Sequence, residues 1–284
     1  MRLRTAAQRS LRPLVVTPRA RTMSTTTKPY VLSEIVLRED APEWPSHSMF
    51  VNRTKSDLAI LGIPYTRDPL TFGTIRGDLA TKTGLKDVTV PTIEYAPGEY
   101  VTDSWTIAEW LEKNHGTPTN TLFPAGSNPF ARFLKRWVDE ELVLEIRELF
   151  RPLFYTYQDA ESAEYFLRVK YGNDSALLNG QIERLGSKAE VAKLGVRGRA
   201  KLRTLENYLA DAPAGGPFFL GDKPTHADSI VFGWYLCSQV NAPVVNAELW
   251  ENDELPRIKA WVGEMKKATG LDLSKQWTPK VVPK

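Results

Sequence analysis

Hydrophobic and polar positions divide the first hundred residues into short elements. Residues 30–38 alternate between the two kinds, which is typical of a β-strand. Over residues 48–61 hydrophobic residues recur at helical spacing, and the run begins at a serine and stops at Gly62. Residues 63–72 then predict a second strand, and residues 74–88 a short irregular helix. The predicted order is strand, helix, strand, helix.

A hairpin follows, made of "VPTIEY" (90–95) and "EYVTDS" (99–104) joined by "APG". The run "SWTIAEWLEKN" (104–114) carries hydrophobic residues at spacings of three and four, so it predicts a helix. A strand–helix–strand unit followed by a hairpin and a closing helix predicts a small mixed sheet with helices on its faces.

The pattern changes after this unit, and the chain divides into an α/β domain (29–115), a linker (116–129), an all-helical domain (130–270) and a tail (271–284). The linker "GTPTNTLFPAGSNP" concentrates Gly, Pro, Asn and Thr. No internal repeat is seen. Helical patterns of the second domain cover residues 130–150, 161–171, 176–210, 226–240 and 255–269.

Composition narrows the function classes. The chain is 42% hydrophobic, and no apolar run reaches the roughly 18 residues that span a bilayer, so we expect no membrane partner. Its basicity belongs to residues 1–28, which hold 7 of the 37 basic residues and no acidic one. The 30 that remain face 34 acidic residues, a net charge of −4. We therefore expect no nucleic-acid partner.

Residues 1–28 are rich in Arg, Ser and Thr, which is typical of a mitochondrial transit peptide. Pro13 and Pro18 interrupt an amphipathic helix in this leader. A disordered tail, or an upstream extension bypassed by starting at Met23, stays open as the alternative. The expected location is mitochondrial or cytoplasmic.

The single cysteine, Cys237, excludes disulfides, zinc clusters and a C-x-x-C redox motif within one chain. It stands among large hydrophobic residues, where a buried thiol acting as a small hydrophobic side chain is the favoured interpretation.

Candidate chemistry begins at the two ends of the hairpin. A cis Val90-Pro91 bond would turn the chain sharply and expose the Val90 main chain, which an extended peptide ligand can pair with as a strand would. A trans proline on an edge strand is the alternative. At the other end, Ser104 fits the N-cap of the next helix, where a carboxylate is attracted, and Asp103 beside it suits an ammonium. Together they describe a clamp for an amino-acid head group.

Ser48 begins the first helix. Its hydroxyl and the positive end of the helix would stabilise a thiolate, because helix N-termini lower the pKa of thiols. The alternative is that Ser48 is only an N-cap and that Ser46 or His47 is the functional residue.

Over residues 30–270 the chain resembles the glutathione transferases, through "VPTIEY", "TDSWTIAEWLEKNHG", "TLFP" and "FFLGDKPTHADSIVFGW". The resemblance implies a thioredoxin-like first domain that binds glutathione as co-substrate, a helical domain that supplies most of the hydrophobic acceptor site, and a homodimer. "SMFVNRTKSDLAILGIPY" looks most like the bacterial β-etherase-type enzymes and their fungal relatives.

Carried over, the resemblance makes Ser48 the catalytic residue, with Ser46 as the alternative. Val90 and Pro91 would hold the glutathione backbone. Asp103 and Ser104 would hold its γ-glutamyl group, and Lys86 or Lys82 its glycine carboxylate. Three residues beside Ser48 depart from the family motif, which puts acceptor specificity in doubt: Met49, Phe50 and Asn52.

The aromatic acceptor pocket is expected between the domains. The candidates to line it are Trp44, Met49, Phe50, Trp137, Phe154, Tyr155 and Tyr157, although an aromatic helix face is more often core. In the second domain Thr225 and Asp228 predict a structural capping box. His226 inside that box is interpreted as a packing or surface residue, and no metal site is expected.

The leading hypothesis is a detoxifying transferase that attacks a hydrophobic or aromatic electrophile, or an aryl ether, with glutathione thiolate. The absence of cysteine at the first helix start favours this activity over disulfide reduction. Two alternatives stay open: a non-catalytic ligand-binding or docking protein of the same fold, and a glutathione-dependent isomerase.

Overall fold

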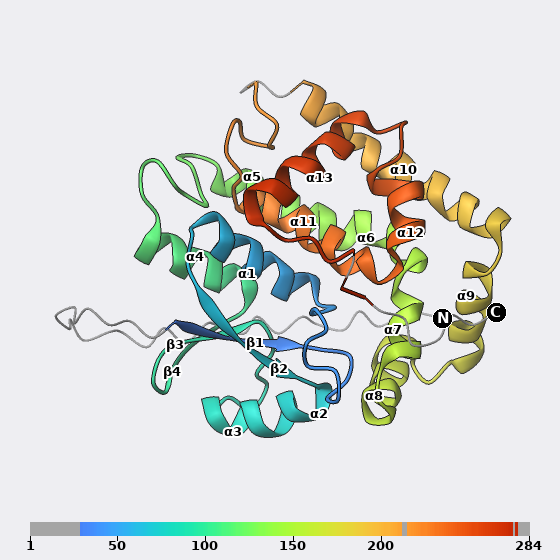
Figure 1. Ribbon diagram of the computed structural model, residues 1–284, viewed down its shortest axis with the longest axis horizontal. Helices are drawn as coiled ribbons and strands as arrows, with labels where there is room; N and C mark the ends of the chain where they lie inside the picture. Colours follow the sequence, from blue (N-terminus) through green and yellow to red (C-terminus); the bar gives the residue numbers. More distant parts are fainter. Residues whose placement is uncertain (1–28, 212–214, 275, 278–284) are drawn as a thin grey trace, which may run out of the picture.

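The structure is a computed structural model that describes residues 29–211, 215–274, 276 and 277. The predicted leader and the end of the tail lie outside these residues. Figure 1 shows a four-stranded sheet beside a larger group of helices. Within the described residues no helix is both long and apolar enough to cross a membrane.

The strands form one mixed sheet in the order β2-β1-β3-β4. β1 (Tyr30–Ile35) runs parallel to β2 (Tyr65–Leu70). β3 (Thr92–Ala96) runs antiparallel to β1, and β4 (Glu99–Thr102) runs antiparallel to β3. The parallel pair needs a crossover, which α1 (Met49–Ile60) provides. The predicted mixed sheet is therefore confirmed, with β3 as a central strand.

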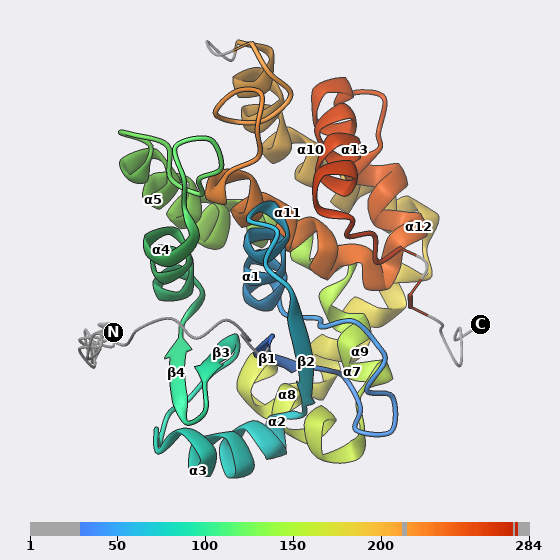
Figure 2. The same ribbon diagram turned by 60° about the vertical axis from the view of Figure 1, so that its left-hand side comes forward.

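Helices cover both faces of this sheet (Figure 2). α1 and α4 (Ser104–His115) bury one face through a cluster that includes Leu32, Ile93 and Ile107. The other face is covered by α2 (Phe72–Thr74), a π-helical turn (Ile75–Leu79) and α3 (Ala80–Thr83). Each face thus has its own hydrophobic core, and the domain has three layers, helices–sheet–helices.

The helical domain surrounds α11 (His226–Ser238), and all 13 residues of α11 are buried. Two helices predicted as continuous are interrupted: residues 130–150 by irregular turns, and residues 176–210 at Gly186, after which the Ser187 hydroxyl caps the next helix. The other helices are α5 (Asn128–Trp137), α6 (Val143–Ile146), α7 (Arg151–Tyr157), α8 (Ala160–Tyr171), α9 (Ser175–Leu185), α10 (Lys188–Ala210), α12 (Ala242–Val245) and α13 (Pro256–Thr269).

The two domains meet where α1 lies against α11 (Figure 1). A Cβ added at Gly233 of α11 would lie 2.5 Å from the main-chain oxygen of Met49 and 2.8 Å from Cγ of Arg53. Glycine therefore permits a backbone approach that no larger residue allows. This contact places the start of α1 beside the helical domain.

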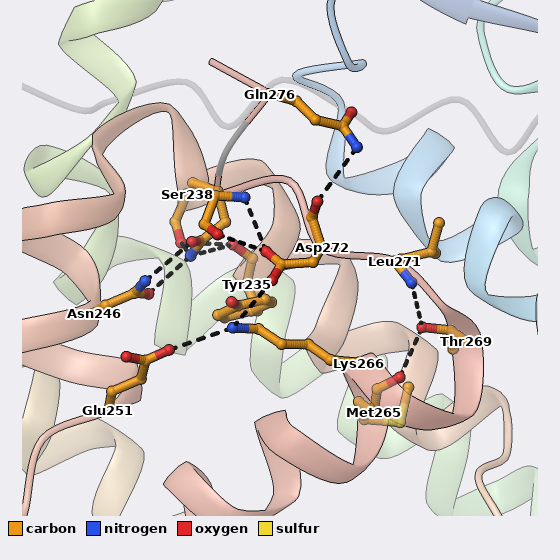
Figure 3. A network of polar contacts seen from close by, with 12 residues as sticks. Tyr235, Ser238, Asn246, Glu251, Met265, Lys266, Thr269, Leu271, Asp272 and Gln276 are labelled. Carbon is orange, nitrogen blue, oxygen red and sulfur yellow. Dashed lines mark hydrogen bonds and ion pairs between the residues drawn. The ribbon is translucent and has the colours of Figure 1, made fainter. Parts of the chain in front are cut away.

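The chain after α13 folds back along the helical domain (Figure 3). Its first turn is held by Thr269, whose hydroxyl donates to the Met265 carbonyl (2.7 Å) and accepts from the Leu271 N–H (3.3 Å). Leu273 is buried in the core, and the Trp277 ring lies 6.0 Å from the ring of Trp44. This C-terminal segment thus reaches the loop that precedes Ser48.

Candidate active site

The register of the sheet brings three chain segments to one edge. Ser33 near the end of β1 pairs with Thr92 at the start of β3, and Thr92 pairs with Thr102 at the end of β4. The loop that leads from β1 to Ser48, the turn before β3 and the first turn of α4 therefore lie at the same edge. This edge holds every residue predicted to bind glutathione apart from the lysines.

The turn before β3 contains a cis peptide bond between Val90 and Pro91. Within the described residues the N–H and C=O of Val90 make no hydrogen bond. The turn is held by Thr92, whose hydroxyl donates to the Thr89 carbonyl (2.7 Å), and by Thr102, which donates to the same oxygen (3.3 Å). A fixed main-chain segment with free donor and acceptor groups suits an extended peptide.

The cap of α4 is Asp103, so the assignment of Ser104 as the N-cap is wrong. The Oδ1 atom of Asp103 accepts from the N–H groups of Trp105 (3.1 Å) and Thr106 (3.0 Å). Asp103 also adopts φ 75° and ψ 126°, a conformation that is uncommon for a residue other than glycine. The single oxygen Oδ1 thus pairs with two first-turn amides, and the Asp103 carboxylate takes the capping position.

Ser104 instead occupies the first position of α4. It is buried, and neither its N–H nor its hydroxyl makes a hydrogen bond within the described residues. The N–H points along the positive end of the helix, where an anion is stabilised. Ser104 thus does not cap α4, and its role as a carboxylate receptor stays a prediction.

The two candidate serines have different surroundings. Ser46 is fully buried, and its hydroxyl donates to the Ile35 carbonyl (2.6 Å) and accepts from the Ser48 N–H (3.2 Å). The Ser48 hydroxyl is half-buried, and it caps α1 by accepting from the Val51 N–H (3.4 Å). The hydrogen of the Ser48 hydroxyl stays available to donate. The geometry therefore suits Ser48 to contact a sulfur atom and Ser46 to hold the loop.

The loop before Ser48 is held from both domains. Arg67 of β2 donates to the main-chain carbonyls of Glu43 (3.2 Å) and Trp44 (2.6 Å). From the helical domain the Cys237 thiol donates to the His47 carbonyl (3.0 Å). Burial raises the pKa of that thiol, so Cys237 stays protonated, and its role is the expected one of a buried side chain.

His47, which precedes Ser48 in the sequence, is buried. Its ring lies 5.0 Å from Phe154 and 6.1 Å from Phe72, and its Nδ1 atom has no hydrogen-bond partner within the described residues. Burial, together with a smaller effect of the Lys170 charge, lowers the pKa of His47 to about 3. The imidazole is therefore neutral at ordinary pH.

α1 carries buried charges that the sequence pattern did not reveal. Arg53 forms a bidentate ion pair with Asp139 of the helical domain and donates to the Ile230 carbonyl (3.3 Å). Although burial raises the pKa of Asp139, Arg53 and Trp234 hold it below its usual range. These contacts join the first helix to the second domain.

The predicted acceptor residues do not all gather in one place. Trp44 is buried, with the ring of Tyr157 at 6.2 Å. Phe50 is exposed and lies under the Arg53 guanidinium (5.2 Å), whereas Trp137 packs under Lys201 of α10 (5.9 Å). The others, Met49, Phe154 and Tyr155, pack against the core of the helical domain.

The two candidate lysines also differ. Lys82 forms an ion pair with Glu94 of β3 (2.9 Å). Lys86 is exposed in the loop before the cis peptide bond, and no ion pair of its ammonium is found within the described residues. Lys86 is thus the better placed of the two to meet a carboxylate.

Asp228 in the predicted capping box accepts from the Thr225 N–H (2.9 Å), the Phe219 N–H (3.0 Å) and Trp261 Nε1 (2.9 Å). His226 is buried rather than on the surface, with Nδ1 2.9 Å from the Asp57 carboxylate of α1. Across the described stretches, no group of three or more His, Cys, Asp or Glu side chains is arranged to hold a metal ion.

Comparison with known proteins agrees with this architecture. Residues 129–267 match the family model described as the glutathione S-transferase C-terminal domain. No curated protein matches the sequence.

Several solved structures share the fold. Glutathione transferase GSTFuA3 from Phanerochaete chrysosporium has a TM-score of 0.68 at 17% identity, over 87% of this chain and 100% of its own. The glutathione S-transferase CsGST63524 of Ceriporiopsis subvermispora, solved with glutathione, has 0.63 at 20% identity, over 90% and 99%. A zeta-class maleyl pyruvate isomerase has 0.50 at 19% identity, over 89% and 100%. The chain has the glutathione transferase fold, as predicted.

Proposed function

We propose that this protein is a glutathione transferase in which Ser48 stabilises the glutathione thiolate. The observation that carries the proposal is the set of free hydrogen-bonding groups at one edge of the sheet. Val90 offers a main-chain donor and acceptor, and Ser104 offers an N–H and a hydroxyl at a helix N-terminus. A tripeptide with a free α-amino acid head group has matching partners for each of them.

In this proposal the peptide part of glutathione pairs with Val90, and its γ-glutamyl carboxylate accepts from Ser104. The oxygens of Asp103 attract the ammonium, and Lys86 meets the glycine carboxylate. The sulfur then lies at the start of α1, where the Ser48 hydroxyl donates to it and the helix end lowers its pKa.

The thiol proton leaves to solvent, and the thiolate attacks an electrophilic carbon of a hydrophobic or aromatic substrate. A carbon–sulfur bond forms as the bond to the leaving group breaks and the leaving group takes the electron pair. An aryl ether, in which an aryloxide leaves, is one candidate substrate class, because the sequence around Ser48 resembles that of the β-etherase-type enzymes.

Ser48→Ala tests the proposal. The ultraviolet absorbance of bound glutathione thiolate should titrate at higher pH in this variant than in the wild type, and turnover should fall about 10- to 100-fold. Glutathione affinity should stay nearly unchanged. Ser46→Ala is the control, and we expect it to lower stability and leave the thiolate titration in place. An unchanged titration in Ser48→Ala would refute the role of Ser48.

A glutathione-dependent isomerase is the second candidate, because the isomerase structure noted above shares the fold. Product analysis separates the two: a conjugate contains the glutathione sulfur, and an isomer does not.

A homodimer is part of the proposal, and light scattering on purified protein tests it. Mitochondrial import is a further part, and a fluorescent fusion to residues 1–28 tests it, with diffuse cytoplasmic signal as the contradicting result.

A further inference from the structure

Three polar side chains near the Ser48 loop are buried without hydrogen-bond partners. His47, Gln158 and Ser162 are 7%, 8% and 1% exposed. His47 Nδ1, both polar atoms of the Gln158 amide and the Ser162 hydroxyl have no partner within the described residues. Proteins rarely leave buried polar atoms unpaired, and such groups often belong to binding sites.

The three side chains come from one junction between the domains. The His47 ring packs on Phe154 of α7 (5.0 Å), and Gln158 follows at the end of that helix, with its N–H on the Phe154 carbonyl (3.2 Å). The next residue, Asp159, donates its N–H to the Leu37 carbonyl in the loop that leads to His47 (3.3 Å). The end of α7 is therefore fixed against that loop.

Ser162 belongs to the same junction. It lies in the first turn of α8, where its N–H donates to Asp159 (2.8 Å). Phe166, one turn further on the same face of α8, contacts Phe154 with a centroid distance of 6.4 Å. α8 also lies beside α2 in both ribbon views, with the rings of Tyr165 and Phe72 stacked at 4.5 Å. Aromatic rings thus pack between the segments that carry the three unpaired polar side chains.

The chemistry of the cluster selects its ligand. The Gln158 amide and the Ser162 hydroxyl supply N–H and O–H donors, and the neutral imidazole of His47 supplies a donor or an acceptor. None of the three carries a charge. The two charges that act beside them, Lys170 on His47 and the Asp159 carboxylate on the Ser162 N–H, have opposite signs, so neither an anion nor a cation is favoured. Donors among aromatic rings suit an uncharged oxygen acceptor on an aromatic molecule.

We propose that His47, Gln158 and Ser162 form the polar end of the acceptor site and bind the carbonyl oxygen of an aromatic substrate. This inference rests on the proposed transferase function, because it assigns the ligand to the acceptor side of that site. The donors orient the substrate by hydrogen bonds, and the thiolate bound at Ser48 attacks elsewhere on it.

Calorimetric titration of the full chain with acetophenone and with ethylbenzene tests the proposal. The two probes have nearly the same shape, and only acetophenone has a carbonyl. Acetophenone should bind about tenfold more tightly, since one net hydrogen bond to a buried partner corresponds to that ratio. The preference should shrink severalfold in Gln158→Leu and in Ser162→Ala. It should persist in Gln276→Leu, a control at an exposed glutamine.

Equal affinity of the wild type for the two probes would overturn the proposal and would indicate that the polar atoms serve structure or ordered water only. A preference that survives unchanged in both Gln158→Leu and Ser162→Ala would also overturn it. Glutathione titration on the same samples separates the two hypotheses. Equal probe affinities with normal glutathione binding refute the carbonyl site alone, whereas a carbonyl preference without glutathione binding refutes the transferase function.

Discussion

His47 should make the stability of this protein depend on pH in a window set by its two pKa values. In the folded protein, burial lowers its pKa to about 3, against an ordinary value of 6.5. The unfolded chain therefore binds more protons between these pH values than the folded chain does. The stabilisation is fully present above pH 6.5 and is lost progressively as the pH falls towards about 3.

The size of the effect follows from the same two pKa values. Each pKa unit corresponds to about 1.4 kcal/mol. Between pH 7.5 and 4.5 the linkage relation gives a loss of roughly 2.5 kcal/mol from His47 alone. The total free energy of unfolding of a protein is commonly about 5–15 kcal/mol, so a loss of this size is measurable.

His47→Phe removes the titrating group and keeps an aromatic ring against Phe72 and Phe154. Urea unfolding at pH 7.5, 6.0 and 4.5 measures the free energy of unfolding of both proteins. Carboxylates contribute equally to the two, so the difference between them isolates His47. The variant should lose roughly 2.5 kcal/mol less than the wild type.

The matched control is His115→Gln. Burial also lowers the pKa of His115, but this side chain is only partly buried, so its variant should change the pH dependence much less. Parallel stability curves for His47→Phe and the wild type would refute the reasoning, because they would mean that His47 titrates alike in the folded and unfolded chains.

Three further predictions concern the domain contact and the cap of α4. Gly233→Ala should destabilise the protein by about 1–3 kcal/mol in thermal unfolding, because the added Cβ would collide with α1. The control Gly263→Ala, where nothing lies within 4 Å of the added Cβ, should stabilise the protein by up to about 1 kcal/mol. Equal effects of the two substitutions would contradict the close contact at Gly233. Arg53→Met should lower the free energy of unfolding by about 3–5 kcal/mol, and adding Asp139→Asn to that variant should recover part of the loss. Additive losses in the double variant would exclude a direct interaction between Arg53 and Asp139. Asp103→Ala should lower the free energy of unfolding by about 1 kcal/mol, and Asp103→Asn should lower it much less, because asparagine is also a good N-cap. Similar losses in the two variants would contradict the capping role of Asp103.

The sheet domain was predictable because its local signals agree with its packing. The hairpin sequence predicts β3 and β4, and the glycine after residue 61 ends α1 as expected. The helical pattern between the first two strands also agrees with their parallel pairing, because two parallel strands need a crossover connection, which α1 provides. By contrast, the isomer of the Val90-Pro91 bond depends on contacts that are distant in sequence, so it stayed open until the structure showed the cis form.

The helical domain was less predictable, because hydrophobic spacing continues through its breaks. Residues 176–210 keep a helical pattern across Gly186, yet the Ser187 side chain starts a new helix there. At α4 two good capping residues stand side by side, and only the main-chain conformation of Asp103 decides between them. Such choices turn on local geometry that the residue types leave open.

The buried charges of α1 escaped prediction for a different reason. A helix with Arg53, Lys55 and Asp57 in five residues has the composition of a solvent-exposed surface, but all three are buried. Arg53 pairs with the helical domain, Lys55 with Glu34 of the sheet, and Asp57 with His226 of α11.

These contacts, two ion pairs and the Asp57–His226 hydrogen bond, point from α1 to different elements, so a rotation or a shift of the helix would separate at least one buried polar group from its partner. Leaving a buried charge unpaired costs several kcal/mol, whereas a sliding hydrophobic contact costs less. The pairs therefore restrict the orientation of α1 more tightly than apolar packing alone would. Because Ser48 caps α1, the same restriction fixes where its hydroxyl and the positive end of the helix lie. The buried charges thus act on the candidate active site by holding the helix that carries it.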